Sequence, residues 1–158
     1  MEIRLATLGD IEPICRLYNE FFAYNAGLQP QYYRAVKESG EYPKSTITSD
    51  ASDIFLAVEN GAVIGFIHVR EAQTPPFDSV AAHKYAEIID FIVAAAHRKK
   101  GIGSALFDAA KQWSKARNLD YIELFVLSNA EDANRFYRRE NFAAVSHTMR
   151  YSLGKTED

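Results

Sequence analysis

The fold is decided by one stretch, residues 88–113, which reads IIDFIVAAAHRKKGIGSALFDAAKQW. Its first part, residues 88–93, is rich in β-branched and aromatic side chains and predicts a buried strand. From Ile102 to Trp113 the apolar residues recur at helical spacing, with polar residues on the opposite face, which predicts an amphipathic helix. A basic turn that contains Gly101 and Gly103 joins the two.

This turn predicts an anion site. A turn that leads from a strand into a helix directs unpaired backbone N–H groups and the positive end of the helix dipole toward one point. Glycine lets an anion approach the main chain closely, and Arg98, Lys99 and Lys100 stand directly before Gly101. These three cations could form only a solvated loop, but their position before Gly-x-Gly favours a ligand that carries phosphate.

Composition narrows the class of protein. The chain has 158 residues, enough for one domain, and is 47% hydrophobic and 25% charged, as is usual for globular proteins. A net charge of −3 argues against non-specific nucleic-acid binding, which needs a broad basic surface. No apolar run approaches the roughly 20 residues of a membrane span and no signal peptide is evident, so we expect a cytoplasmic protein without a membrane partner.

Cysteine and histidine usage gives no sign of a metal or a thiol nucleophile. Cys15 has no second cysteine to pair with, and on an apolar helix face it is expected to be a buried, inert thiol. The four histidines lie on separate elements without the spacing of metal ligands, so we expect no metal. Of these, His68 could face a binding cleft, although simple exposure to solvent is the favoured interpretation.

The remaining elements follow from hydrophobic periodicity and turn residues. Asn60-Gly61 between two β-rich runs predicts a tight hairpin. We expect a mixed α/β layer structure with a single domain over residues 1–153 and a polar tail over 154–158. Strands are expected at 2–6, 53–59, 62–69, 84–94, 121–127 and 143–153. Helices are expected at 7–24, 30–39 and 129–139 and from Ile102 to a left-handed cap at Asn118, and a loop is expected at 41–52.

Two motifs resemble those of a known family. The run from Val93 to Gly103 resembles the pyrophosphate turn of the GNAT superfamily of acetyl-coenzyme A dependent N-acetyltransferases, whose pattern is Arg/Gln-x-x-Gly-x-Gly/Ala after a strand ending in Val. Downstream, Ala133-x-x-Phe136-Tyr137 followed by Phe142 resembles the second signature of the family. The chain departs from the pattern in having Ala95 where Pro is frequent and Asn141 where Gly is usual, although Asn also tolerates positive φ.

The resemblance implies a fold and a site. The implied fold is α/β (α+β), a GNAT fold with a mixed central sheet of six to seven strands flanked by about four helices. Acetyl-coenzyme A would be the cosubstrate, and the acetyl group would pass in a ternary complex to a primary amine, such as a small amine, an amino-acid derivative or a peptide amine. Homodimers are frequent in the family, so a dimer is expected. The implied cosubstrate-binding residues are the backbone of Phe91, Ile92 and Val93 for the thioester and pantetheine arm, the turn Arg98, Lys99, Lys100, Gly101, Ile102, Gly103 and Ser104 for the pyrophosphate, and either Asn129 or Asn134.

The chemistry calls for a base and an acid. An alkylammonium has a pKa of about 10.4 and must lose a proton before it attacks, for which a carboxylate is a natural acceptor. Glu87, in Ala-Glu-Ile eleven residues before Arg98, matches the base of the histone-acetylating branch, although it could instead be a solvated or ion-paired strand residue. Asp90 is expected on the opposite face of the strand, in a structural role. Tyr137 matches the usual acid of the family, with aromatic packing as its alternative.

Other interpretations fit less well. A dinucleotide turn would need glycine at Leu106, and a Walker A loop would need Gly-Lys-Ser/Thr. The remaining alternative is a GNAT-like domain that binds acyl-coenzyme A as a sensor or partner module without turnover. The segments 21–42 and 72–85 combine aromatic residues with carboxylates, which suits a cationic amine, although core packing would account for most of these aromatic residues.

Overall fold

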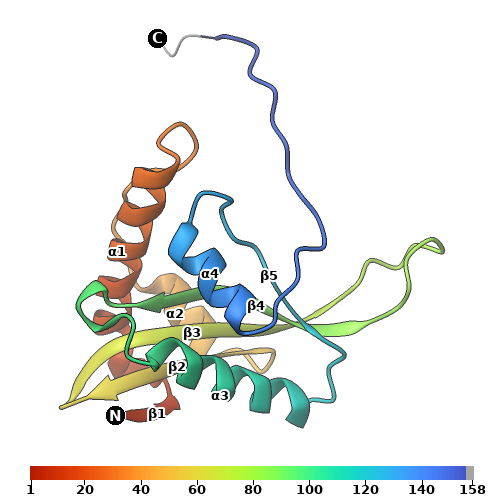
Figure 1. Ribbon diagram of the computed structural model, residues 1–158. Coiled ribbons are helices and arrows are strands. Elements are labelled where there is room, and N and C mark those ends of the chain that lie inside the picture. Colours follow the sequence, from red (N-terminus) through yellow and green to blue (C-terminus); the bar gives the residue numbers. More distant parts are fainter. Residues whose placement is uncertain (156–158) are drawn as a thin grey trace. The chain divides into compact units, whose positions relative to one another are not determined.

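The computed structural model describes residues 1–155, which form two compact units, one of residues 1–125 and one that begins at Val126. Each unit is described by itself. The second unit contains one helix, α4 (Glu131–Arg139). The first contains β1 (Glu2–Leu5), the 3₁₀ helix η1 (Leu8–Asp10), α1 (Ile11–Leu28), α2 (Glu41–Ile47), β2 (Ser52–Glu59), β3 (Ala62–Gln73), β4 (Lys84–Val93), the 3₁₀ helix η2 (Ala95–His97), α3 (Ile102–Ala116) and β5 (Ile122–Leu124) (Figure 1).

The first unit is built on one mixed sheet with the strand order β1-β2-β3-β4-β5. Neighbouring strands from β1 to β4 are antiparallel, whereas β4 and β5 are parallel. The hairpin between β2 and β3 turns at Asn60 (φ 50°) and Gly61 (φ 77°), which confirms the hairpin predicted from Asn-Gly. The described residues form five strands, so the expected six to seven strands are wrong.

The two faces of the sheet are covered by different helices. On one face, Ile14 and Tyr18 of α1 are buried against Phe66 of β3 and Ile92 of β4. On the other face, Trp113 of α3 packs on Val69 and Ala86. Its indole N–H donates a hydrogen bond of 2.7 Å to Asp53 Oδ2, which ties α3 to β2. The sheet is therefore the middle layer between α1 and α3, as Figure 1 shows.

The helices before β2 differ from expectation. The backbone N–H and hydroxyl of Thr7 both donate to Asp10 Oδ2, at 2.8 and 2.9 Å, which confirms the side-chain contact of the predicted capping box. The following helix α1 extends to Leu28 rather than Tyr24. The helix predicted at 30–39 is absent. Helix α2 occupies residues 41–47 of the segment 41–52 that was predicted to be a loop. Gly40, at φ 97°, is the N-cap of α2 rather than the end of a preceding helix.

The C-terminal unit contains the largest departure. Helix α4 ends as predicted, because Asn141 adopts φ 67° and the Phe142 N–H donates to the Tyr137 carbonyl at 2.9 Å. The strand predicted at 143–153 is wrong, since these residues form no regular structure, and β5 is shorter than the predicted 121–127. Of the predicted tail, Gly154 and Lys155 are described, and residues 156–158 lie outside the described residues.

Two kinds of feature are absent from the described part of the chain. No helix there is both long and apolar enough to span a membrane. No group of three or more His, Cys, Asp or Glu side chains in residues 1–155 is arranged to hold a metal ion. Cys15 is half-buried, and burial raises the pKa of its thiol.

Candidate functional site

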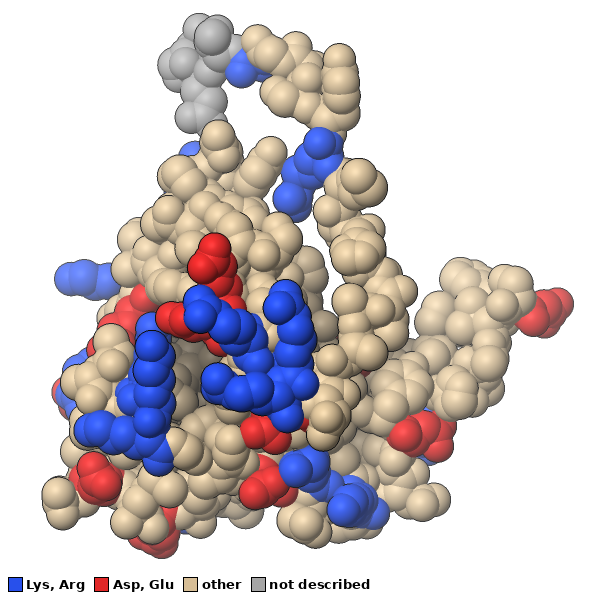
Figure 2. Space-filling view, viewed as in Figure 1, with Lys and Arg blue, Asp and Glu red and all other residues tan. Residues whose placement is uncertain are grey.

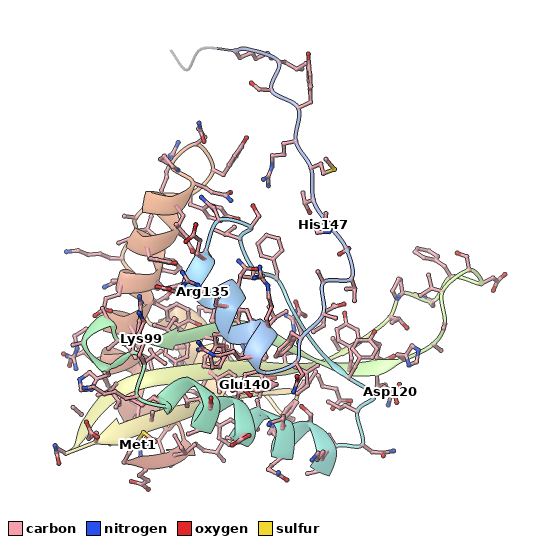
Figure 3. All side chains as sticks on the ribbon, viewed as in Figure 1. Met1, Lys99, Asp120, Arg135, Glu140 and His147 are labelled. Atoms are coloured by element: carbon pink, nitrogen blue, oxygen red, sulfur yellow. The ribbon has the colours of Figure 1, made fainter. Side chains whose placement is uncertain are left out.

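The turn between β4 and α3 has the backbone of an anion-binding nest. Lys99 (φ 62°) and Gly101 (φ 79°) are both left-handed, with Lys100 between them. Alternation of this kind directs neighbouring N–H groups toward a common point. A Cβ added at Gly101 would meet no atom within 4 Å, so glycine is favoured there by its dihedral angles and not by crowding. Figure 3 labels Lys99 on this turn.

No capping or acidic side chain of the described residues would compete with a bound anion at the start of α3. Gly101 is its N-cap, no side chain of the described residues caps it, and its first turn contains no acidic residue. The positive end of the helix dipole and the cations 98–100 therefore act in the same direction. The Arg98 Nε–H donates to the Val93 carbonyl at 3.0 Å, and its guanidinium lies 5.6 Å from the centroid of the Tyr24 ring. Arg98 is thus held beside the end of β4.

The two parallel strands part next to this turn. β4 pairs with β5 only from Ala86 with Ile122 to Ile88 with Leu124, and then continues to Val93 without β5. The segment assigned to the thioester and pantetheine, Phe91 to Val93, lies entirely beyond the last β4–β5 pair. On its other side, this segment remains paired with β3. In the region that leads to the turn, β4 therefore has no neighbouring strand on the side of β5 among the described residues.

A β-bulge in β4 changes which side chains share a face. His68 pairs with Asp90 and Val69 with Ile88, so Ile89 is an extra residue. Glu87 pairs with Arg70, two residues from His68, and this brings Glu87 and Asp90 onto the same face. The expectation that they lie on opposite faces is wrong, because regular alternation does not continue through a bulge.

That face carries a polar cluster beneath α1 and α2. The Tyr18 hydroxyl donates to Asp90 Oδ2 at 2.7 Å, and His68 Nδ1 lies 3.7 Å from the same oxygen. The Tyr42 hydroxyl is 3.5 Å from His68 Nδ1. Tyr18 and His68 are 1% and 2% exposed, and the buried Nε2 of His68 has no hydrogen-bond partner among the described residues. We call Tyr18, Tyr42, His68 and Asp90 the Asp90 cluster.

Burial and charge alter the acidity of both phenols. Burial, with a contribution from the Asp90 carboxylate, raises the pKa of Tyr18 far above its ordinary value. Burial also raises the pKa of Tyr42 to about 12, and the carboxylates of Asp90 and Glu87 contribute while Arg70 opposes them. Both phenols are therefore protonated at neutral pH and act as hydrogen-bond donors or acceptors without charge.

Glu87 has a cationic partner. Arg70 Nη2 donates to Glu87 Oε2 at 2.7 Å, and this bond raises the pKa of the guanidinium. The Glu87 side chain is 33% exposed, so the carboxylate remains open to solvent. The ion pair matches the alternative considered for Glu87, and the charge of this carboxylate also contributes to the raised pKa of Tyr42 in the Asp90 cluster. The sequence analysis did not identify Arg70 or Tyr18 as residues of this region. The polar residues at 68 and 70 within an apolar strand were the available signal for Arg70.

The second unit holds the remaining candidates. The Tyr137 ring packs against Phe136 and Phe142, with centroids 5.5 and 5.4 Å away, and burial raises the pKa of its hydroxyl. The Asn134 amide donates to the carbonyls of Leu127 and Ala130 at 2.9 and 2.8 Å, so its NH₂ group anchors the loop before α4. Asn129 is exposed in the turn before α4.

The aromatic residues of segments 21–42 and 72–85, expected near the acceptor, differ in their surroundings. Phe21 and Phe22 pack against the core on the α1 face, whereas Tyr85 stacks on Tyr121, outside these segments, with ring centroids 5.0 Å apart. Tyr42 is 41% exposed although its hydroxyl reaches the Asp90 cluster. Among these residues, Tyr42 therefore connects solvent with buried polar groups.

The family model and the related sequences that match this chain all belong to acetyltransferases. The sequence model of the acetyltransferase (GNAT) family matches residues 11–142. A protein named as an uncharacterized N-acetyltransferase from Archaeoglobus fulgidus is 28% identical over 141 residues, covering 89% of this chain and 92% of its own. The uncharacterized N-acetyltransferase YhfO of Bacillus subtilis is 25% identical over 97% of both chains.

Solved structures agree with the fold. A tetramutant of the BH1408 protein from Bacillus halodurans, at 25% identity, gives a TM-score of 0.92 over 97% of this chain and 100% of that chain. An aminoglycoside N-acetyltransferase in complex with CoA, at 13% identity, gives a TM-score of 0.74 over 96% of this chain and 98% of that chain. The second likeness concerns the fold alone.

Proposed function

The chain belongs to the acetyltransferase (GNAT) family, and on that premise we propose that it transfers the acetyl group of acetyl-coenzyme A to a primary amine by direct attack in a ternary complex. The observation that carries this proposal is the turn before α3, where Lys99 and Gly101 are left-handed and the helix start is uncapped. Enzymatic transfer is favoured over a non-catalytic acyl-coenzyme A sensor because the carboxylate of Glu87 and the Asp90 cluster share one face of β4, the strand that carries Phe91 to Val93.

The residues of the turn fit a pyrophosphate. The backbone N–H groups near Gly101 to Ser104 would donate to phosphate oxygens, while Lys99 and Lys100 would add charge. The Arg98 guanidinium, held at the Val93 carbonyl, would face the same anion from the end of β4. Coenzyme A supplies an acetyl group activated as a thioester, and the backbone of Phe91 to Val93 would hold this arm where β4 has left β5.

Glu87 is our first choice as the base. Its carboxylate is accessible to water, so it could accept a proton from the ammonium directly or through a water molecule. The Arg70 guanidinium donates to this carboxylate and would need to move away as the proton arrives. Asp90 lies on the same face through the bulge and is the second candidate. The neutral amine would then attack the carbonyl carbon.

Tyr137 is our choice as the acid. As the carbon–sulfur bond breaks, the phenol would give its proton to the departing sulfur and recover one from solvent. Packing against Phe136 and Phe142 fixes the ring, which suits a group that must act at one position. For the contact with the cosubstrate, Asn129 and Asn134 are both candidates, and in this structure the Asn134 NH₂ group donates to two carbonyls.

For the acceptor we propose a small amine, an amino-acid derivative or a peptide amine. The Glu87 and Asp90 carboxylates attract a cation, and the face of the Tyr42 ring offers a cation–π contact. A neutral or anionic acceptor would find no charge complement at these two residues.

The test combines binding with turnover. We expect calorimetric titration to show binding of acetyl-coenzyme A, and a thiol-release assay over a panel of primary amines to show amine-dependent release. Binding without release on a wide panel would favour the sensor alternative. Absence of binding would refute the assignment of the turn, and the proposed function with it.

A further inference from the structure

The ion pair between Arg70 and Glu87 lies on the face of the sheet that carries the Asp90 cluster. The two residues are register partners on β3 and β4, and Arg70 Nη2 donates to Glu87 Oε2 at 2.7 Å. Acidic and basic side chains are interspersed over the face in view in Figure 2, so an exposed ion pair is not by itself a sign of a ligand site. This pair differs from the others in its free donors, its charged neighbours and its position at the proposed base.

Arg70 has hydrogen-bonding capacity that the protein does not use. A guanidinium carries several N–H donors, and among residues 1–155 the structure gives Arg70 no acceptor other than Glu87. The Arg70 side chain is 49% exposed, so a ligand can reach the remaining donors. Because these donors form a planar fork that matches a carboxylate, Arg70 is suited to bind the carboxylate of a ligand.

The charges next to this pair give a ligand one orientation. Parallel pairing places Glu123 of β5 opposite Glu87, so Arg70, Glu87 and Glu123 follow one another across three neighbouring strands. Register partners present their side chains on the same face of a sheet. The row is therefore cationic at β3 and anionic at β4 and β5. A ligand with both charges would place its carboxylate toward β3 and its ammonium toward β4.

The proposed reaction also requires a new partner for Arg70. Glu87 accepts the proton of the amine only if the guanidinium moves away from it, and this movement leaves the charge of Arg70 uncompensated. A carboxylate on the acceptor would supply the missing anion as the ammonium reaches Glu87. In an α-amino acid a single carbon atom joins the two groups, so both can meet side chains that are themselves in contact. A longer spacer would bring only one group to the pair.

We infer that the acceptor is an α-amino acid whose carboxylate binds Arg70 while its amine faces Glu87, so that the ligand replaces the ion pair of the free protein. This inference rests on the proposed function and names its substrate class. One proton of the ammonium passes to Glu87 and on to water, and the nitrogen attacks the thioester carbon. The carbon–nitrogen bond forms as the carbon–sulfur bond breaks, and a second proton lost by nitrogen balances the one that sulfur gains. The products are the N-acetyl amino acid and coenzyme A.

The test compares amino acids with their carboxamides, which keep the primary amine and lose the anionic charge. The matched pairs are the acid and amide forms of leucine, phenylalanine, glutamine, lysine and aspartate, which sample apolar, aromatic, polar, basic and acidic side chains. Calorimetric titration into protein saturated with coenzyme A measures binding, and thiol release from acetyl-coenzyme A measures turnover. For at least one pair, we expect the amino acid to exceed its amide at least about tenfold in affinity and in kcat/KM.

Three variants of the full chain locate this preference. Arg70→Gln removes the charge, and Arg70→Lys keeps the charge but not the fork. Arg16→Gln is the matched control, because Arg16 forms an exposed ion pair of 2.8 Å with Glu12 on α1. The ratio of amino acid to amide should fall to near one in Arg70→Gln, recover in part in Arg70→Lys and stay at the wild-type value in Arg16→Gln. Circular dichroism and thermal unfolding show whether each variant is folded.

The two readouts separate this inference from the proposed function. Binding of an amino acid that depends on Arg70, without thiol release from any amine, would remove the transferase activity and keep the amino-acid site. Equal binding and turnover of acid and amide in every pair, or a preference that persists in Arg70→Gln, would overturn the inference and leave the proposed function intact. Absence of both amino-acid binding and turnover would overturn both.

Discussion

Replacing Gly101 and Gly61 by alanine separates a binding role from a backbone role. The two glycines have nearly the same conformation, with φ 79° and φ 77°, and an added Cβ would meet no atom within 4 Å at either position. An L-residue in the left-handed region costs about 1–2 kcal/mol. Each variant should therefore lose the same roughly 1–2 kcal/mol of unfolding free energy, and its melting temperature should fall by roughly 2–8 °C.

Only one of the two positions adjoins the proposed phosphate site. Gly101 caps α3, whereas Gly61 lies in the hairpin between β2 and β3. A methyl group at 101, and the shift of the turn that relieves its strain, should disturb the N–H groups that face the anion. We expect the dissociation constant for coenzyme A to rise at least about tenfold in Gly101→Ala, which is about 1.4 kcal/mol, and to stay within about twofold in Gly61→Ala.

Calorimetric titration with coenzyme A and thermal unfolding of both variants provide the two readouts. If Gly101→Ala were as destabilised as Gly61→Ala but bound coenzyme A normally, the assignment of the turn would be refuted. If both variants lost affinity equally, the loss would come from general destabilisation and the turn would have no special role.

Three further variants test other parts of the molecule. Arg4 binds Asp10 through two hydrogen bonds and lowers the pKa of that carboxyl, so this stabilisation is present above the unfolded-state pKa of about 3.9 and is lost as pH falls below it. Denaturant unfolding should show Asp10→Asn about 2 kcal/mol less stable than wild type at pH 7, with the difference shrinking below about pH 4; a constant difference would contradict this. Glu87→Gln should lower kcat/KM for the amine about 100-fold in the thiol-release assay, and a normal value there with a loss in Asp90→Asn would transfer the base to Asp90. Tyr137→Phe keeps the aromatic packing and should lower kcat at least about tenfold with little change in coenzyme A affinity, whereas an unchanged kcat would remove the acid role.

The central turn was predictable because its conformation depends on neighbouring residues. The change from strand to helix periodicity located α3, and Gly101 together with Asn60-Gly61 adopted the positive φ angles for which these residues are selected. Asn118 and Asn141 likewise adopted the left-handed conformation expected after helices α3 and α4.

Positions that depend on a tertiary partner were not predictable in the same way. Glycine commonly follows the last residue of a helix, which is why Gly40 was expected to end one. In the structure, its left-handed backbone instead precedes the first residue of α2. A Cβ there would lie 2.9 Å from Cγ2 of Ile11, so packing against α1 also requires glycine. The extra residue Ile89 is invisible in a run of apolar residues, because a bulge is defined by the register against β3 and not by the side chain of the bulged residue.

The sequence by itself determined the strand, turn and helix of residues 88–113 and the hairpin, since periodicity and positive-φ residues act over a few positions. The phosphate-binding role of the turn stays a prediction. Only the tertiary structure decided that Glu87 and Asp90 share a face and that Tyr18, Tyr42 and His68 join Asp90, because these contacts link residues far apart in the chain. It also decided that residues 143–153 form no strand within the described chain. A period-two pattern states which face of a strand is apolar, but a strand forms only where a second strand supplies the hydrogen bonds.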